Sequence, residues 1–563
     1  MLRPVRDHAG HQARAVFAGH GIDVMWTLCG AHVFPLYDAA VRGEPAMRIV
    51  DVRHEQTAVF GAEATAKLTR TPGLAVLTAG PGVTNGASAI AQSFASGVPV
   101  LTVGGRAPSA RWGMGALQEL DHPPILAPIT KRSITARTAD QFAAVLDDAL
   151  RLACTPHRGP VFVDVPIDAL FAPADGDGQP TPGGEPSAPN QSGPTTAAGR
   201  ALGTPPDPDD LTAVAALLAG AHRPVLVLGS DVWLDGAESA ALQFAEQTAI
   251  PVVANGMGRG VLRRGHPLLV NRARATAFAR ADLVIIGGTP LDFRLSYGDF
   301  GKGTSVVHVV DAPEQLATHV ALAGSVAGDL SAAFDGLLAA YQGELRRSSS
   351  ADWLRVLRTE VARAAADDAA MLSSDAEPIH PARIYGELMR LLDDDAVVIG
   401  DGGDFVSWAG RFLDPARPGC WLDPGPFGCL GAGAGAAAAA RLARPRSQVV
   451  VLYGDGAAGM SLMDVDTLVR HAFPVVLVVG NNGAWGLEKH PMRAVFGYDV
   501  AADLRRETAY EGVVQALGGA GEAVDRPDGI EPALRRAFAA GVPYLVNVRC
   551  DPRVAYPRST FGV

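Results

Sequence analysis

Short apolar runs, most of them rich in valine, recur along the chain between amphipathic or alanine-rich stretches. Such runs, bounded by turn residues, are typical of buried parallel strands, and their alternation with helical stretches predicts a doubly wound α/β architecture. The predicted strands are 25–28, 48–52, 74–78, 98–103, 161–165, 225–228, 251–254, 283–286, 306–310, 396–399, 449–453, 475–479 and 544–548. The stretch 57–68 is predicted to be helical, and the Gly/Ala-rich stretch 431–440 to be a tightly packed, buried helix.

Two changes in composition divide this pattern. The stretch 172–208 is rich in Pro, Gly, Ser, Thr and Asp without periodicity, which predicts a mostly unstructured linker, and 343–352 resembles a second one. A chain of 563 residues is long enough for roughly three domains of ~150 residues each. We therefore predict domains at 1–171, 209–342 and 353–563, each with its own parallel sheet.

Polar residues follow two neighbouring strands of the third predicted domain. Strand 449–453 ends in Gly454-Asp455-Gly456, and strand 475–479 is followed by Gly480 and Asn481-Asn482. Parallel strands of a βαβ unit end at the same sheet edge, where ligands of such sheets bind, so Asp455 and Asn482 are predicted to meet. Their hard oxygen atoms suit Mg²⁺, and the glycines allow the backbone to approach a diphosphate closely.

The GDG and NN motifs, with this spacing and both flanking strands, resemble the thiamine-diphosphate signature of the acetolactate synthase, benzaldehyde lyase and 2-hydroxyacyl-CoA lyase superfamily. The resemblance covers nearly the whole chain. It implies that Asp455, Asn482 and the backbone carbonyl of Ala484 ligate Mg²⁺. It also implies that the three α/β units are the pyrimidine-binding, central and diphosphate-binding domains.

A second segment carries the same resemblance. Arg53-His54-Glu55, followed by AEATAK at 62–67 and LTAGPGVTN at 77–85, is similar to the pyrimidine-domain pattern of this superfamily. By that resemblance Glu55 is the acid that hydrogen-bonds the pyrimidine ring and activates the cofactor. Without it, a glutamate at a helix start would be explained by the helix dipole alone.

The resemblance assigns further residues to the cofactor pocket. Leu430, in Gly428-Cys429-Leu430-Gly431, is the choice for the bulky side chain beneath the cofactor; a core leucine is the plain alternative. The turn at 403–405 is expected to contact the diphosphate. The full set of expected cofactor contacts is Gly80, Pro81, Asn85, Gly403, Asp404, Phe405, Gly428, Leu430, Gly454, Asp455, Gly456, Ala457, Asn482, Ala484 and Trp485.

Two residues are candidates for acid–base chemistry beside Glu55. His32 follows the first strand in a Gly-Ala-His segment that is similar to benzaldehyde lyase, and Gln118 resembles the pocket glutamine of carboligases. Histidine suits proton transfer near neutral pH, although a lone His or Gln more often caps or satisfies backbone. Weaker candidates are His54, His490, Arg111 and Lys131. Arg111 or Lys131 could hold a substrate carboxylate, and a solvated surface charge is the plain alternative for these two.

The chain departs from acetolactate synthases in several places. After the NN motif it reads NNGAWG, which is closer to benzaldehyde lyase, and the QWQ of acetolactate synthases is absent. Leu117 stands where many of them have Phe. The segment 291–298 is more similar to lyase relatives than to the segment near flavin, which argues against FAD and against two-pyruvate specificity.

The net charge bears on the possible binding partners, and the cysteine content bears on the cellular compartment. A net charge of −11 and a pI of about 5.7 argue against nucleic acid and anionic membranes. Five cysteines without a CxxC pair suit a reducing compartment, and the N-terminus lacks the apolar core of a signal peptide, so a cytoplasmic protein is expected.

These observations favour a thiamine-diphosphate- and Mg²⁺-dependent carboligase or decarboxylase of 2-oxo acids, similar to acetolactate synthase. The alternative is a lyase or ligase of 2-hydroxy ketones or 2-hydroxyacyl-CoA thioesters. A non-catalytic cofactor-binding protein is a third hypothesis, which the intact Glu55, Asp455 and Asn482 disfavour. The resemblance further implies a homodimer or homotetramer with active sites between chains. The donor and acceptor substrates, any regulatory subunit and any nucleotide in the central domain are not defined by the sequence.

Overall fold

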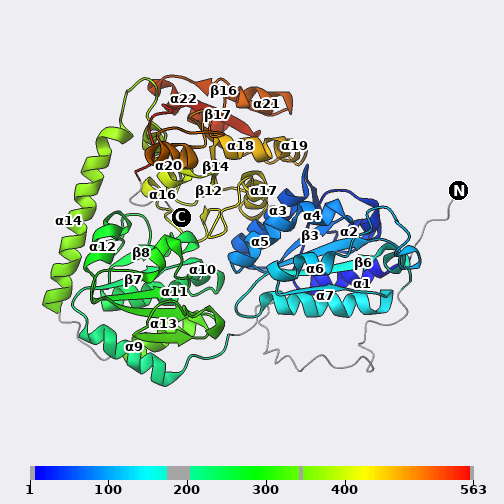
Figure 1. The fold of residues 1–563 in the computed structure, drawn as a ribbon, viewed down its shortest axis with the longest axis horizontal. Coiled ribbons are helices and arrows are strands. Elements are labelled where there is room, and N and C mark those ends of the chain that lie inside the picture. The colour runs from blue at the N-terminus through cyan, green and yellow to red at the C-terminus, as the bar shows by residue number, and fades with distance from the viewer. Residues whose placement is uncertain (1–6, 174–202, 342–346, 558–563) are drawn as a thin grey trace. The chain divides into compact units, whose positions relative to one another are not determined.

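A computed structural model describes residues 7–173, 203–341 and 347–557 (Figure 1). These residues form two compact units. Unit 1 comprises the described residues before 202 together with Phe427–Ala443 and Asp466–His471, and unit 2 comprises the remainder. Unit 1 contains one parallel sheet and unit 2 contains two, which confirms the predicted fold class of three parallel-sheet domains.

The sheet of unit 1 has the strand order β2-β1-β3-β4-β6-β5, and all its pairs are parallel. The strand order runs in opposite directions on the two sides of the β1–β3 pair. The helices that connect the strands therefore cover both faces of the sheet, as in other doubly wound sheets. The strands are β1 Val24–Thr27, β2 Arg48–Asp51, β3 Gly73–Leu77, β4 Val100–Arg106, β5 Arg132–Thr135 and β6 Val161–Pro166.

Two groups of helices enclose this sheet. One face packs against α1, α2, α7 and α8, and the other against α3 and α5, with α4 beside these two helices; the distant segment α17 packs on α3. Their bounds are α1 Ala9–Gly19, α2 Phe34–Arg42, α3 Glu55–Thr69, α4 Pro81–Asn85, α5 Ala87–Ala95, α6 His122–Leu126, α7 Ala139–Cys154, α8 Ile167–Phe171 and α17 Gly433–Ala443. The predicted small-residue helix is α17, and it is buried from Gly433 to Ala440.

The first sheet of unit 2 has the order β11-β10-β9-β7-β8, again all parallel. Its strands are β7 Pro224–Leu228, β8 Val252–Ala254, β9 Leu283–Gly287, β10 Ser305–Val310 and β11 Gly324–Ala327. The helices of this part are α9 Pro208–Gly220, α10 Ser230–Leu234, α11 Glu238–Thr248, α12 Arg274–Arg280, α13 Leu330–Ala340 and α14 Arg347–Leu372.

The second sheet of unit 2 has the order β13-β12-β14-β15-β17-β16. Its strands are β12 Val397–Asp401, β13 Trp421–Leu422, β14 Val449–Gly454, β15 Val476–Asn481, β16 Ala520–Val524 and β17 Tyr544–Arg549. The helices along this stretch are α15 Ala382–Leu391, α16 Asp404–Phe412, α18 Asp455–Ser461, α19 Val465–Arg470, α20 Gly486–Phe496, α21 Tyr510–Ala516 and α22 Ile530–Ala539. The predicted βαβ unit is therefore present, and β14 pairs with β15 in parallel.

All thirteen predicted strands are present, with ends displaced by at most a few residues. Within the described ranges, the unpredicted strands are β5, β11, β13 and β16, and each lies at the end of its sheet. The predicted domain boundaries stay predictions. Most of the predicted first linker lies outside the described residues, and α14 begins at Arg347, inside the predicted second linker. Among the described helices, none combines the length and the apolar character that crossing a bilayer requires.

The packing of α17 on α3 gives a test of unit 1. A Cβ on Gly435 would lie 2.8 Å from the Thr57 carbonyl oxygen and 3.0 Å from the Gly61 nitrogen. We expect Gly435→Ala to lower the thermal unfolding midpoint, because overpacking costs about 1–3 kcal/mol and exceeds the helix-propensity gain of about 0.5–1 kcal/mol.

The matched control is Gly459→Ala in α18, where a Cβ would meet no heavy atom within 4 Å. This substitution should leave the unfolding midpoint unchanged or raise it. Equal shifts in the same direction for both variants would contradict the tight approach of α17 to α3.

Candidate cofactor site

The carboxyl ends of β14 and β15 bring together the two motifs of unit 2. Asp455 is the first residue of α18 and is 2% exposed, and its Oδ2 accepts the Gly483 N–H at 2.7 Å. Asn482 directly follows β15, and its Oδ1 accepts the Ala484 N–H at 3.1 Å. Residues that are far apart in the sequence thus lie side by side because both strands end at this edge.

Asp455 is a buried carboxylate without a cationic partner. Burial raises its pKa to about 6, and N–H donors from Gly483 and Gly456 only partly oppose this effect. None of the ion pairs within the described parts of the chain includes Asp455. A bound divalent cation would stabilise the ionised form, and the oxygens available beside it, the Asn482 amide and the Ala484 carbonyl, are hard ligands.

A second glycine turn lies beside the GDG turn. Gly402 has φ +141°, and a Cβ on it would approach the Gly454 nitrogen to 2.9 Å, so the turns after β12 and β14 are in contact. Asp404 begins α16, and its Oδ1 accepts the Tyr556 N–H at 3.1 Å. Phe405 is only 5% exposed and packs under Gly480, which places its side chain in the core of the sheet.

The remaining predicted contacts of unit 2 surround Gly456. A Cβ on Gly456 would lie 2.5 Å from the Trp485 ring, so that ring covers the first turn of α18. Ala457 and Ala484 are buried in the same region. Gly403 abuts Leu487, since a Cβ there would lie 2.4 Å from Leu487 Cδ1.

Gly428 and Leu430 belong to the segment of unit 1 that precedes α17. Gly428 is exposed with φ +72°, and Leu430 is half-buried. The neighbouring Cys429 lies with its Sγ 3.4 Å from the Ser88 carbonyl oxygen.

In unit 1, Glu55 occupies the first turn of α3, just after β2. It is 7% exposed, and its Oε2 accepts the Asn85 side-chain amide at 3.0 Å. Asn85 ends α4, so two predicted residues from different elements meet here. His54 Nδ1 caps α3 by accepting the Gln56 N–H at 3.2 Å.

Gly80 and Pro81 form the turn between β3 and α4. Gly80 has φ +59°, and a Cβ on it would lie 2.9 Å from Gln118 Cβ, so the predicted pocket glutamine packs directly on this turn. Gln118 itself has φ +59°, a left-handed conformation that is uncommon for a side-chain-bearing residue. The Gly80–Pro81 turn therefore packs against the Gln118 loop with no room for a side chain at position 80.

His32 lies in the short 3-10 helix η1 Ala31–Val33 after β1. Its Nδ1 is 3.1 Å from Thr78 Oγ1, and its side chain is only 7% exposed. Burial lowers the pKa of His32, which favours the neutral imidazole, a form that can accept a proton.

The weaker candidates Arg111, Lys131 and His490 differ in how far they are exposed and in what they contact. Arg111 is exposed in η2 Ser109–Arg111. The Lys131 ammonium donates to both oxygens of Thr155 and to the His157 carbonyl, at 2.7–2.8 Å. His490 is half-buried in α20, and burial lowers its pKa.

Sequence reasoning missed a buried polar group at the same edge of unit 1, formed by Arg106, His122 and Asp164. His122 and Asp164 are 0% exposed, and His122 Nε2 accepts the Gly80 N–H at 2.9 Å. Asp164 interrupts the apolar strand 161–165, and a carboxylate in a buried strand is the signal that could have revealed the group.

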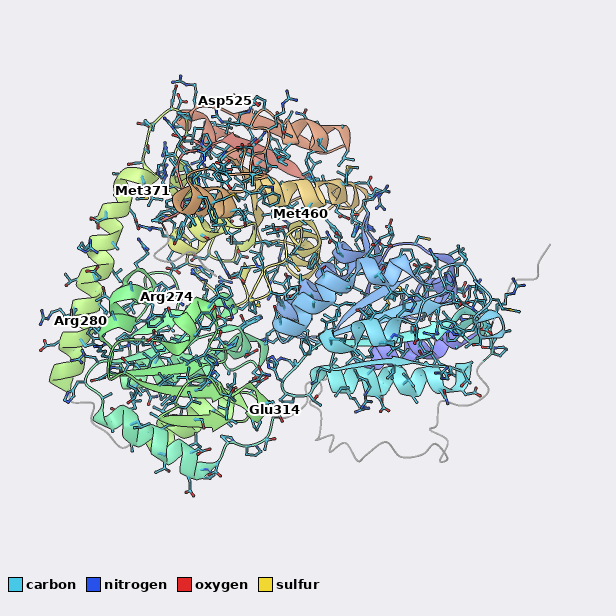
Figure 2. All side chains as sticks on the ribbon, in the orientation of Figure 1. Arg274, Arg280, Glu314, Met371, Met460 and Asp525 are labelled. Carbon is cyan, nitrogen blue, oxygen red and sulfur yellow. The ribbon has the colours of Figure 1, made fainter. Side chains whose placement is uncertain are left out.

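A separate arginine group lies in the central part of unit 2. Arg274, labelled in Figure 2, donates to the Arg294 carbonyl, and burial together with the nearby Arg259 lowers its pKa to about 10. Arg294 in turn binds Asp292 through a two-pronged contact at 2.7–3.0 Å. The Arg294 guanidinium is therefore paired with Asp292 inside the segment 291–298, which the sequence analysis compared with lyase relatives.

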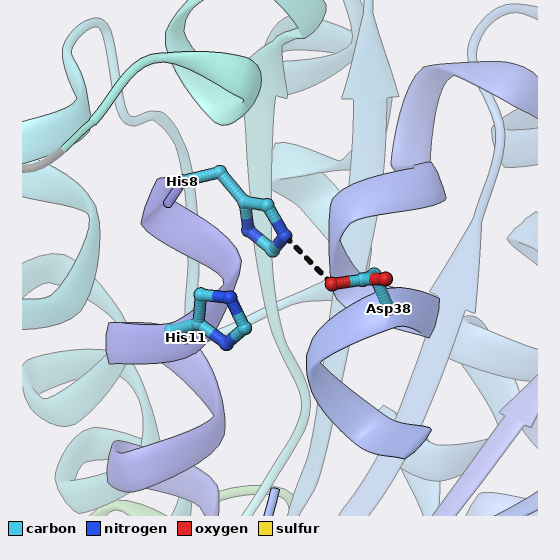
Figure 3. Close-up of side chains that lie close together, drawn as sticks. All are labelled: His8, His11 and Asp38. Carbon is cyan, nitrogen blue, oxygen red and sulfur yellow. Dashed lines mark hydrogen bonds and ion pairs between the residues drawn. The ribbon is translucent and has the colours of Figure 1, made fainter. Parts of the chain in front are cut away.

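A second cluster with metal-ligand chemistry comprises His8, His11 and Asp38 (Figure 3). His8 Nε2 is 3.1 Å from Asp38 Oδ2, and Arg42 pairs with the other Asp38 oxygen at 2.9 Å. The two imidazole rings are stacked at 4.2 Å with only 13° between their planes. Because a metal lies near the plane of each imidazole ligand, parallel stacked rings do not converge on one ion, and the cluster is explained by packing and ion pairing.

Comparison with protein families gives three matches along the chain. Residues 8–125 match the N-terminal TPP-binding domain of thiamine pyrophosphate enzymes, residues 211–337 match the central domain, and residues 401–548 match the C-terminal TPP-binding domain. Each match covers strands of a different one of the three parallel sheets.

Comparison with individual proteins gives two kinds of relative. The acetolactate synthase large subunit IlvG of Mycobacterium tuberculosis is 47% identical over 98% of this chain and 97% of its own length. The 2-hydroxyacyl-CoA lyase 2 of Mus musculus is 34% identical over 92% of this chain and 85% of its own length. The human protein of that name is 33% identical over 96% of this chain.

The lowered pKa of His32 predicts a pH dependence of stability. The unfolded chain protonates this histidine below about pH 6.5, whereas the folded protein resists protonation, so the stability it contributes is present above that pH and declines as the pH falls. We expect the unfolding midpoint to fall more steeply between pH 7.5 and 5.5 in the parent than in His32→Gln. Parallel curves would show that His32 titrates alike in both states.

Proposed function

This chain belongs to the thiamine pyrophosphate enzymes, and we propose that it is an acetolactate synthase-like carboligase or decarboxylase of 2-oxo acids. The observation that carries the proposal is the 47% identity over 98% of the chain to a protein named acetolactate synthase. The buried Glu55–Asn85 pair and the Asp455–Asn482 edge support it, since both halves of the cofactor site retain their acidic residues.

The two halves would serve different parts of the cofactor. Bound thiamine diphosphate supplies a nucleophilic carbon that adds to a substrate carbonyl and accepts the electron pair of the broken carbon–carbon bond. Glu55 would hold a proton at Oε1 or Oε2 toward the pyrimidine ring. Its hydrogen bond from Asn85 fixes the carboxyl orientation, which limits the reorganisation needed during the reaction.

We propose that Asp455, Asn482 and the Ala484 carbonyl hold Mg²⁺, which would bridge the chain to the diphosphate. The buried Asp455 carboxylate supports this assignment, because it lacks the cation that would offset its desolvation. The glycines of the turns at 402–403 and 454–456 carry no side chain that would keep phosphate oxygens from the backbone.

We propose that His32 and Gln118 are the residues that act on the substrate. His32 is buried and favours its neutral form, so it can take or return a proton at the substrate oxygen. Gln118 is held in its loop against Gly80 and can orient a carbonyl through its amide. We also infer a homodimer or homotetramer with sites between chains, an inference that sedimentation of cofactor-loaded protein would test.

A carbon–carbon lyase of 2-hydroxy ketones or 2-hydroxyacyl-CoA thioesters is the second candidate. Two observations favour it: the 34% identity to a 2-hydroxyacyl-CoA lyase 2 and the NNGAWG segment in place of a QWQ-containing one.

Product analysis separates these candidates. Purified protein with thiamine diphosphate and Mg²⁺ would be supplied with pyruvate, with pyruvate plus an aldehyde, or with a 2-hydroxyacyl-CoA thioester. The proposal expects acetolactate from pyruvate alone. Cleavage of the thioester without acetolactate formation would assign the chain to the lyase candidate, and binding of cofactor without turnover of any substrate would favour a non-catalytic protein.

Glu55→Gln tests the role of the carboxyl group. We expect a loss of about 10²–10⁴-fold in kcat, with Mg²⁺ and diphosphate binding retained, because the amide cannot transfer a proton. Steady-state kinetics and calorimetry measure the two effects. Glu63→Gln is a matched control on the same helix, where Glu63 accepts the Gln92 amide at 2.8 Å and pairs with Lys67. The control should lower stability and leave turnover by the folded enzyme unchanged; turnover of Glu55→Gln equal to the parent would refute the role.

Asp455→Asn tests the metal site. We expect thiamine diphosphate affinity in the presence of Mg²⁺ to fall at least ~10-fold, or about 1.4 kcal/mol, because the uncharged amide is a weaker ligand. Titration calorimetry measures the affinity. The cofactor-free variant should remain folded, since it avoids burying an ionised carboxylate, and unchanged affinity in that folded variant would exclude Asp455 as a ligand.

A further inference from the structure

A hydrogen-bonded network of Arg106, His122 and Asp164 connects β4, β6 and the turn after β3 in unit 1. Asp164 lies in β6, and its Oδ2 accepts hydrogen bonds from Arg106 at 2.9 Å and from His122 Nδ1 at 2.9 Å. Arg106 ends β4, and His122 begins α6. At the far side of the ring, His122 Nε2 accepts the Gly80 N–H at 2.9 Å, which joins the turn after β3 to the group.

The hydrogen-bond partners determine the protonation of His122. A backbone N–H can only donate, so Nε2 must carry a lone pair, and the ring proton therefore sits on Nδ1 and is donated to Asp164. This pattern of donors and acceptors assigns one tautomer to the His122 ring. The amide of Gly80 is thereby directed toward His122.

The same group fixes the loop that carries Gln118. Arg106 donates to Asp121 at 2.9 Å and lies 3.8 Å from the centre of the Trp112 ring, so it holds both ends of the loop. Within the loop, the Glu119 carboxylate accepts the N–H groups of Gly113 at 3.0 Å and Ala116 at 3.4 Å. The left-handed Gln118 thus sits in a loop restrained at its ends and in its middle.

We propose that His122, supported by Asp164 and Arg106, is a positioning residue that fixes the Gly80–Pro81 turn against the Gln118 loop. The turn and the loop are two walls of the candidate site, and the imidazole sets the distance between them through the Gly80 bond. His122 does not touch the reacting atoms. The inference rests on the proposed function of these walls, and its test therefore includes a measurement that does not depend on turnover.

The test compares His122→Phe, His122→Gln and the parent. Phenylalanine fills the space but removes both ring nitrogens, whereas the glutamine amide can accept from Gly80 and donate to Asp164. His20→Phe is the matched control, because His20 also pairs with an aspartate, Asp147, at 2.7 Å, but lies before β1 at the opposite edge of the sheet.

The first readout is amide hydrogen exchange of the cofactor-free protein in the peptide covering 79–86. We expect faster exchange in His122→Phe, restoration in His122→Gln and no change in His20→Phe. The second readout is calorimetry with thiamine diphosphate and Mg²⁺, for which we expect Kd to rise about 10-fold in His122→Phe. The third is turnover, for which kcat should fall by about 100-fold, as expected when catalytic groups are displaced by about 1 Å.

The readouts distinguish the failure of this inference from the failure of the proposed function. If the parent turns over none of the substrates, exchange and cofactor affinity still decide the role of His122. A folded His122→Phe protein with parental exchange at 79–86 and a Kd within twofold of the parent would overturn the proposal. Equal losses in His122→Phe and His122→Gln would also overturn it, because the second variant retains the bond to Gly80.

Discussion

In each unit, the sheet edge at which parallel strands end is the constraint on which the candidate site residues depend. In unit 2 it places Asp455 beside the segment after β15, and in unit 1 it gathers Glu55, His32 and the Gly80 turn from three different strands. Polar residues at this edge are expensive to bury, so each is held by a defined partner: a backbone N–H for Asp455, an amide for Glu55, a hydroxyl for His32.

The central strands of each sheet could be predicted from the sequence, whereas several strands at the sheet ends could not. Central strands are buried on both faces and read as continuous apolar runs, as in β14, where Val449–Tyr453 are all buried. The missed strands β5 and β16 lie at sheet ends and are mostly half-buried, so their sequences carry polar residues and no clear period. Pairing with a neighbour, and not apolar content, makes these segments strands.

The site was predictable where a motif combined residue type with spacing, and unpredictable where function depends on orientation. The meeting of Asp455 with Asn482 could be expected from their places after neighbouring parallel strands, whereas Glu55 and Asn85 were assigned to the pocket only by the family resemblance. The partnership of His122 with Gly80 could not, because a histidine far along the chain gives no sign of which backbone amide it accepts. Orientation is also hidden at Phe405: the sequence places it beside a glycine turn but gives no sign that its side chain packs beneath Gly480.

The discontinuity of unit 1 has a consequence for biosynthesis. The alanine-rich face of α3 is covered by α17, whose residues emerge from the ribosome only after all of the central part of the chain has been made. At 5–20 residues per second, that interval is on the order of tens of seconds. During this time the nascent N-terminal sheet must persist with one helical layer incomplete, so completion of the first unit is tied to synthesis of the last third of the chain.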